Sequence, residues 1–250
     1  YGAGRYWQGD SAIGKDASIK MNISGGWIQK ALYGSGHGGT NASHHKSVEI
    51  NVSGGTIKEL NGIHGDATVY EDVSINITGG AITDLYGARK HIVSDSDSSA
   101  YIPHVEGNVT VTLGGNAVVS NLHAKEEGAN VSGKIRMRYS GAENQTLGDI
   151  TGFDALQLIA SKVTVPAGKE NIWDSIATMQ MTDDSLLSLA SVPTAPAVKV
   201  GVEVVKAAEN WNLTTPLITA PAGTEDMFEV NSPLNYDFAY EESGEKVTWT

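Results

Sequence analysis

A short sequence motif built around two adjacent glycines, called a word below, recurs four times in the first half of the chain. The glycine pairs begin at residues 25, 54, 79 and 114, so consecutive copies lie 29, 25 and 35 residues apart. The words are alike, as in SVEINVSGGTIKELNG and DVSINITGGAITDLYG, whereas the segments between them differ in length and content. Repeats of about 20 to 50 residues indicate a chain that stacks copies of one small structural unit.

Each copy has apolar residues at alternate positions before its glycine pair. The second copy has Val48, Ile50 and Val52 there, and the other three copies show the same alternation. This period of two predicts a strand with one buried face. A second short strand follows the glycines, with an apolar pair such as Ile57 and Leu60. The glycine pair itself predicts a tight corner between the two strands.

Strand, corner, strand and loop in each copy predict an all-β fold, a right-handed parallel β-helix (β-solenoid) with loops projecting along one edge. Each strand would pair with its equivalent in the next copy. Outward-facing Asn22, Asn51 and Asn76 should then form a column. The fourth copy shifts its glycines by one residue and places Thr112 in that column, which predicts a bulge or a changed corner.

Strand signals continue beyond the four copies, although the glycine pair is lost. We expect β-helix coils over residues 1–197, and final coils with a C-terminal capping segment over residues 198–250. A cap is expected because an open last coil would leave its backbone groups unpaired. The chain begins at Tyr1 within a repeat, so we also expect further repeats upstream.

The words INVSGGTIKELNG, NITGGAITDLYG, GFDALQLIASKVTV and LITAPAG resemble the β-helical passenger regions of bacterial surface adhesins and autotransporter-like proteins. These regions belong to the pectin-lyase-like right-handed β-helix class, and the resemblance covers about residues 1–220. It implies a place outside a bacterium or on its surface, and binding of a glycan or a host surface protein. The same fold also carries lyases, hydrolases and phage tailspikes, so the resemblance does not assign an activity.

Composition excludes several classes of partner. The chain has 17 Lys and Arg against 29 Asp and Glu, a net charge of −12, which argues against a nucleic-acid surface or an anionic-membrane patch. There is no cysteine, so neither disulfides nor thiolate metal sites contribute. No run approaches the roughly 18 apolar residues of a membrane span. We therefore expect no membrane span in this segment. We also expect no cofactor.

The second strand of the first three copies ends in a Leu-Tyr-Gly-like word at residues 32–34, 60–62 and 85–87. All seven histidines lie at or after this word or its counterpart in the fourth copy. If the copies stack, the loops that follow this word should emerge along a single edge and bring the histidines together. They are then either ordinary polar loop residues or parts of a binding edge, a metal site or a pH-sensitive site, because imidazole binds transition metals and titrates near neutrality. The histidines are His37, His44, His45, His64, His91, His104 and His123.

Tyr33 and Tyr86 hold the same place in their copies, with Asn61 between them and His123 after them; Tyr1 is expected in the same column. Such a column is either simple packing or a sugar-binding surface, since sugar rings present apolar faces to aromatics and hydroxyls to polar groups. Tyr33, Tyr86 and the seven histidines are therefore the candidate ligand-binding residues.

The longest loop, ARKHIVSDSDSSAYIPHVEG, carries Asp95 and Asp97 at a spacing that a calcium ion could use. The glycine and the closing glutamate of an EF-hand are absent from their places. The loop is thus either a solvated connection or a recognition loop, and the identity of any metal stays open.

A second alternative to a binding segment is an enzyme of this fold class. The polysaccharide hydrolases resemble one another in carrying Asn-Thr-Asp, Asp-Asp, His-Gly and Arg-Ile-Lys words in that order. Here His37-Gly38 and His64-Gly65 precede Asp183-Asp184, the other two words are missing, and MTDDSLL fits a turn. A lyase would need a carboxylate-bound calcium and a cationic base on the outward strand positions. We therefore predict no catalytic residues and a non-enzymatic, adhesin-type binding segment; the alternatives are a polysaccharide lyase or glycoside hydrolase, or a structural stalk.

Overall fold

The computed structural model describes residues 15–35, 44–94, 97–143, 145–146, 148–182, 184–192, 199–205, 216–224, 226–231, 240–243 and 246–249. These residues form strands almost throughout, and one 3-10 helix, η1 (Glu170–Asp174), lies among them. The chain divides into two compact units, Tyr1–Arg136 and Met137–Thr250. In the part that the structure describes, no helix is long and apolar enough to cross a membrane.

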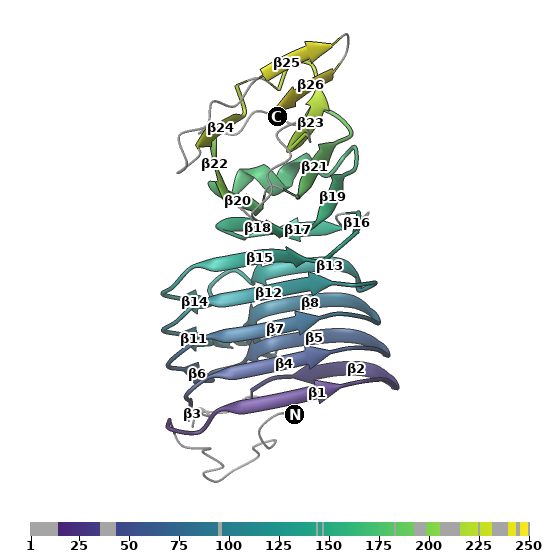
Figure 1. Ribbon diagram of the computed structural model, residues 1–250. Coiled ribbons are helices and arrows are strands. Elements are labelled where there is room, and N and C mark those ends of the chain that lie inside the picture. Colours follow the sequence, from purple (N-terminus) through teal and green to yellow (C-terminus); the bar gives the residue numbers. More distant parts are fainter. Residues whose placement is uncertain are drawn as a thin grey trace. The chain divides into compact units, whose positions relative to one another are not determined.

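Three parallel sheets form the first unit (Figure 1), and each sequence repeat contributes one strand to each sheet. The first sheet contains β1 (Ile19–Ile23), β4 (Val48–Val52), β7 (Val73–Ile77) and β12 (Val109–Gly114). The second sheet contains β2 (Trp27–Tyr33), β5 (Thr56–His64), β8 (Ala81–Arg89) and β13 (Val118–Lys125). The third sheet contains β3 (His44–His45), β6 (Thr68–Val69), β11 (His104–Val105) and β14 (Asn130–Val131).

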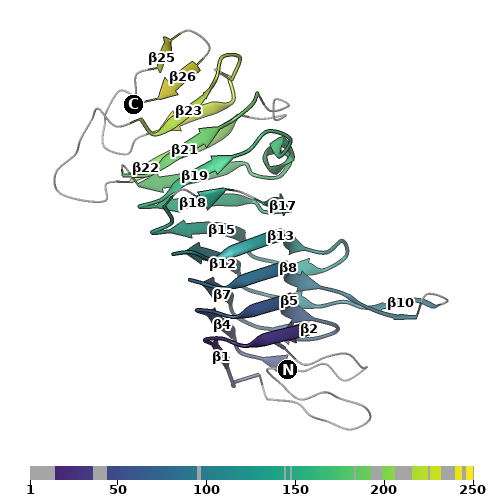
Figure 2. The ribbon, with the colours of Figure 1, turned by 90° about the vertical axis from the view of Figure 1, so that its right-hand side faces the viewer.

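Strand pairing in these sheets joins equivalent residues of consecutive repeats, as in Ile50 beside Ile75 and Leu60 beside Leu85, with one register shift between Ile28 and Ala31 in the β2–β5 pair. The architecture is thus all-β with parallel sheets, and it is compatible with a β-helix. An antiparallel pair, β9 (His91–Ser94) and β10 (Asp97–Tyr101), interrupts the pattern between β8 and β11 and projects away from the sheets (Figure 2).

The alternating apolar residues form the interior of the first unit. Ile50 and Ile75 are 0% exposed, and the alternate residues on either side of them are equally buried. Full burial of such a side chain contributes about 1.5 to 3 kcal/mol, so stacked repeats stabilise one another where a single repeat could not. The first repeat is less well covered, because Met21 and Ile23 are only half-buried.

The glycine pairs form the corners that the sequence predicts. The second glycine of each pair has a positive φ, +92° at Gly26, +95° at Gly55, +90° at Gly80 and +54° at Gly115. Side chains disfavour this backbone region, which explains the glycine. In the fourth repeat β12 keeps an unbroken register with β7 through residue 113, so the shifted glycines change the corner rather than insert a bulge.

The glycine of the Leu-Tyr-Gly-like word lies inside the strand in the second and third repeats, so the loop begins later there than directly after this word. Strands β5 and β8 continue through Gly62 and Gly87. A Cβ atom at Gly62 would lie 2.6 Å from the Gly87 carbonyl oxygen and 2.9 Å from Cδ1 of Ile75. This glycine therefore lets the second sheet approach the side chains of the first sheet closely.

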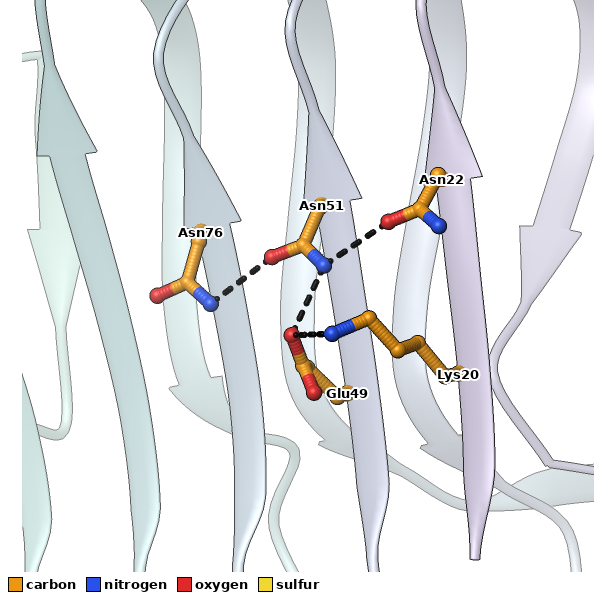
Figure 3. Close-up of polar contacts among 5 residues, drawn as sticks. All are labelled: Lys20, Asn22, Glu49, Asn51 and Asn76. Carbon is orange, nitrogen blue, oxygen red and sulfur yellow. Dashed lines mark hydrogen bonds and ion pairs between the residues drawn. The ribbon is translucent and has the colours of Figure 1, made fainter.

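The predicted asparagine column is confirmed on the first sheet (Figure 3). Asn51 Nδ2 donates to Asn22 Oδ1 (2.9 Å) and to Glu49 Oε1 (2.8 Å), and Asn51 Oδ1 accepts from Asn76 Nδ2 (3.0 Å). Lys20 Nζ lies 2.8 Å from the same Glu49 oxygen. Both amide atoms of Asn51 thus bind asparagines of the neighbouring repeats, and its nitrogen also binds Glu49 of its own strand, which makes this column a stabilising feature of the sheet.

The second unit continues as strands without glycine pairs, and β15 (Ile135–Ser140) spans the boundary between the units. One parallel series contains β18 (Ala155–Ile159), β20 (Thr178–Thr182), β22 (Val200–Val205) and β24 (Phe228–Asn231). Another contains β16 (Gln145–Thr146), β19 (Lys162–Val165), β21 (Leu186–Leu189) and β23 (Ile218–Pro221). The short strand β17 (Asp149–Thr151) lies between β16 and β18 in the chain.

A hairpin of β25 (Tyr240–Ser243) and β26 (Lys246–Trp249) ends the described residues, and β26 pairs antiparallel with β23. The parallel order therefore changes within the segment 198–250, where the sequence places final coils and a cap. The capping role and the boundary at residue 197 stay predictions.

Replacing Gly62 by alanine should destabilise the protein by about 1 to 3 kcal/mol, because the added methyl group overlaps a carbonyl oxygen and a core methyl group. Gly25→Ala is the matched control, since a Cβ there meets nothing within 4 Å. Urea unfolding followed by circular dichroism measures both changes. Equal stability of the two variants would contradict the close sheet-to-sheet approach.

Candidate functional site

The predicted tyrosine column exists on the second sheet. Tyr33, Asn61, Tyr86 and His123 are register partners on β2, β5, β8 and β13, and we call these four residues the tyrosine column. The rings of Tyr86 and His123 stack with centroids 4.7 Å apart and planes inclined by 18°. The guanidinium carbon of Arg89 lies 4.3 Å from the centre of the Tyr86 ring. Packing within the column therefore explains why Tyr86 and His123, which are each half-buried, occupy these positions.

Charged side chains lie beside this column. Arg89 Nη1 is 2.6 Å from Glu59 Oε2, and Arg89 Nε is 3.9 Å from Glu126 Oε2; we call these three residues the carboxylate cluster. Asn61 Nδ2 donates to the other oxygen of Glu59 (2.8 Å). Burial by itself would lower the pKa of Arg89, but the hydrogen bond and charge of Glu59 outweigh it and raise the pKa. Arg89 is thus a fixed cation at this site.

Two acceptor atoms of this region lack a hydrogen-bond partner. Asn61 is 0% exposed, and its Oδ1 accepts no hydrogen bond. Glu126 Oε2 is also buried and without one, because 3.9 Å to Arg89 is too long for a hydrogen bond. Burial also raises the pKa of the neighbouring Tyr86 hydroxyl, with Arg89 opposing the shift, so this residue stays neutral at physiological pH.

A run of four rings leads from the column to the projecting hairpin. Centroid distances are 4.6 Å from Tyr33 to His64, 5.2 Å from His64 to His91 and 6.1 Å from His91 to Tyr101. We call these residues the ring strip. His64 is buried, whereas the other three rings are half-buried. The structure thus brings two of the predicted histidines together with Tyr33.

His44 and His104 lie on the third sheet and are separated by Thr68 in the register. The ring of His44 stacks on Tyr70, whose hydroxyl is 3.0 Å from His44 Nδ1. Burial raises the pKa of Asp66, and positive charge on His44 and His91 acts in the opposite direction.

His45 occupies a core position. It is 0% exposed, and its register partners in the next repeats are Val69, Val105 and Val131. Neither ring nitrogen has a hydrogen-bond partner. Burial, aided by the charge of His44, lowers the pKa of His45 to about 4.

The prediction that the histidines gather along a single edge stays a prediction. The described histidines lie in the tyrosine column, in the ring strip and on the third sheet. His37, Tyr1, Asp95 and the side chain of Asp97 are outside what the structure describes. Among the described residues no group of three or more His, Asp or Glu is arranged to hold a metal ion. Asp184 lies in the turn between β20 and β21, as the MTDDSLL word suggests.

Sequence reasoning missed the carboxylate cluster. Glu59 and Asp84 lie in different copies, and the alternation within one copy does not show that they are direct register partners on the second sheet. The register also places Arg89 beside His64. When the copies are aligned on the glycine of the Leu-Tyr-Gly-like word, Arg89 falls opposite His64 two residues after that glycine. This alignment is the sequence signal that predicts the position of Arg89.

Comparison of the chain with protein families, curated proteins and solved structures found no match in any of the three.

His45→Val should make the protein less sensitive to acid. The pKa of His45 is about 4 in the folded protein and near 6.5 when unfolded, so the unfolded state takes up a proton first as the pH falls. The native protein should lose roughly 3 kcal/mol of stability between pH 6.5 and pH 4 from this residue. Valine, which fills the equivalent position in the next repeats, should remove that loss. Urea unfolding at a series of pH values measures it.

His104→Val provides the control, because it removes a half-buried histidine from the same sheet. If His45→Val retained the full acid sensitivity, the buried neutral state of His45 would be wrong.

Proposed function

We propose that this chain is a right-handed parallel β-helix (β-solenoid) segment of an adhesin-type bacterial surface protein. In this proposal the segment is extracellular or displayed at the cell surface. It binds a glycan, free or carried on a host surface protein, without catalysing a reaction. The parallel sheets and their repeat-by-repeat register support the fold, and the resemblance of the repeated words to adhesin passenger regions supports the location.

The observation that carries the binding proposal is the combination of rings and acceptors on the second sheet. The ring strip leaves three half-buried rings, Tyr33, His91 and Tyr101, on one continuous path. The tyrosine column and the carboxylate cluster add amide and carboxylate oxygens beside that path. Sugars bind through this chemistry, because their C–H faces contact rings and their hydroxyls donate to oxygen acceptors.

The first sheet offers a contrast that favours the second sheet as the site. Its asparagine column is polar too, but Asn51 already uses both amide atoms in contacts with the neighbouring strands (Figure 3). A ligand there would have to break those hydrogen bonds before it made its own. The second sheet instead has half-buried rings, and its two unmet acceptors, Asn61 Oδ1 and Glu126 Oε2, are buried beneath its surface.

The contacts of Glu59 support binding rather than catalysis. One of its oxygens accepts from Asn61 and the other pairs with Arg89. A carboxylate engaged at both oxygens is held in place as a positioning group and is poorly suited to exchange protons with a substrate. Because strand pairing fixes these residues, little conformational entropy would be lost when a ligand binds.

Tyr33→Ala and Tyr101→Ala should each weaken glycan binding about tenfold, as expected when an aromatic contact of about 1 to 1.5 kcal/mol is lost. An array of immobilised oligosaccharides, probed with the whole chain, identifies the ligands, and titration calorimetry measures the affinities. Lys20→Ala on the first sheet is the matched surface control and should bind as the parent does. Failure to bind any glycan, or unchanged binding by both tyrosine variants, would contradict the proposal.

A further inference from the structure

His45 occupies a position at which the other three repeats have valine. Strand pairing on the third sheet aligns it with Val69, Val105 and Val131. Its side chain is 0% exposed, and neither ring nitrogen has a hydrogen-bond partner among the described residues. Apolar packing alone therefore holds this ring, and such packing suits its neutral form.

No neighbouring group offsets a positive charge on His45. Among the described residues, the charge that bears on this ring is that of His44, and two adjacent imidazolium groups repel each other. Lys46 Nζ lies 3.7 Å from Glu71 Oε1, and the pKa of Asp66 responds to His44 and not to His45. Burial and the charge of His44 together lower the pKa of His45 to about 4.

The strand that carries His45 is short and lies at the end of its sheet (Figure 1). In the described part of the third sheet, β3 is the terminal strand, and its two residues pair with β6. The Tyr70 amide donates to the His45 carbonyl oxygen (3.0 Å), and the Tyr70 side chain stacks on His44 and hydrogen-bonds with its Nδ1. Because a hydroxyl can donate or accept, this side-chain contact tolerates a proton on His44. The buried ring of His45 is the part of β3 that a proton disfavours.

A fall in pH therefore favours a form in which His45 meets water. The buried ring takes up a proton near pH 4, whereas a solvated histidine does so near pH 6.5. The open form binds the proton first, so the equilibrium shifts toward it about tenfold per pH unit between these two values. Terminal strands with few hydrogen bonds open at a lower cost than the core of a sheet, so the shift acts first on β3. The equivalent valines have no proton to gain.

From this arrangement we propose that β3 is an acid-sensitive latch: protonation of His45 detaches β3 from β6, while β6, β11 and β14 stay paired. Opening exposes the edge of β6, where the Tyr70 amide loses its acceptor and Val69, 0% exposed in the closed form, is uncovered on one side. The latch converts a fall in pH into a local change at the surface of the first unit. This inference goes beyond the proposed function and does not depend on glycan binding.

Amide hydrogen exchange of the whole chain, followed by NMR, tests the latch at three equivalent amides of the third sheet. Each donates to the core residue of the preceding repeat: Tyr70 to His45 (3.0 Å), Glu106 to Val69 (2.9 Å) and Ser132 to Val105 (2.8 Å). Between pH 6.5 and pH 4.5 the protection factor of the Tyr70 amide, corrected for the intrinsic exchange rate, should fall about 100-fold. The protection factors of the other two amides should change little.

His45→Val should abolish the pH response of the Tyr70 amide, because valine takes up no proton and already fills the equivalent positions. His104→Val, which removes a half-buried histidine from the same sheet, is the matched control and should leave the response intact. Circular dichroism shows whether each variant is folded. The comparison of three amides within the unchanged chain decides the question even where a variant folds poorly.

Three results would overturn the latch. The first is a Tyr70 protection factor that does not change with pH. The second is an equal fall at Tyr70, Glu106 and Ser132, because the opening would then involve the whole sheet. The third is a fall that persists in folded His45→Val, because the proton responsible would then bind to another group.

Discussion

Parallel pairing of each strand with its equivalent one repeat later is the interaction on which the first unit depends. It places like residues side by side at every level, so a single apolar pattern fills the interior and a single polar pattern repeats on the outside. The backbone hydrogen bonds fix the register, and the glycine corners allow the chain to turn from the first sheet into the second in each repeat. Both the packing and the candidate site follow from this register.

One register has opposite consequences on two sheets. On the first sheet, identical asparagines face one another, and each amide donates to the amide before it. On the second sheet, the equivalent positions hold two tyrosines, one asparagine and one histidine. Unlike residues cannot satisfy one another in this way, so the rings stack where they meet and Asn61 keeps an unmet oxygen. Regularity stabilises the first sheet, and departure from it places the rings and the unmet oxygen of the candidate site on the second.

The sequence predicts features that depend on spacing within one repeat. Alternation indicates which residues are buried, the glycine pair indicates the corner, and equal placement indicates the columns of Asn51 and Tyr86. These properties need no knowledge of how far a strand continues.

The carboxylate cluster and the core position of His45 depend on more than spacing. Arg89 meets Glu59 because β8 continues past Gly87, which the sequence indicates only when the copies are aligned beyond that glycine. His45 is buried because its two-residue strand aligns with Val69, although histidine is usually found nearer the surface. Since neither Arg89 nor His45 belongs to the repeated words, the alternation within one copy does not predict their contacts.

The register itself is tested most directly by cysteine cross-linking, since the chain has no cysteine of its own. Ser74 and Thr110 are direct partners on β7 and β12, whereas Thr112 pairs with Asn76. Under mild oxidation, the Ser74→Cys/Thr110→Cys pair should form a disulfide readily, and the Ser74→Cys/Thr112→Cys pair, about 8 Å apart at Cα, should not. Preferential closure of the second pair, or closure of neither, would contradict the repeat-to-repeat register.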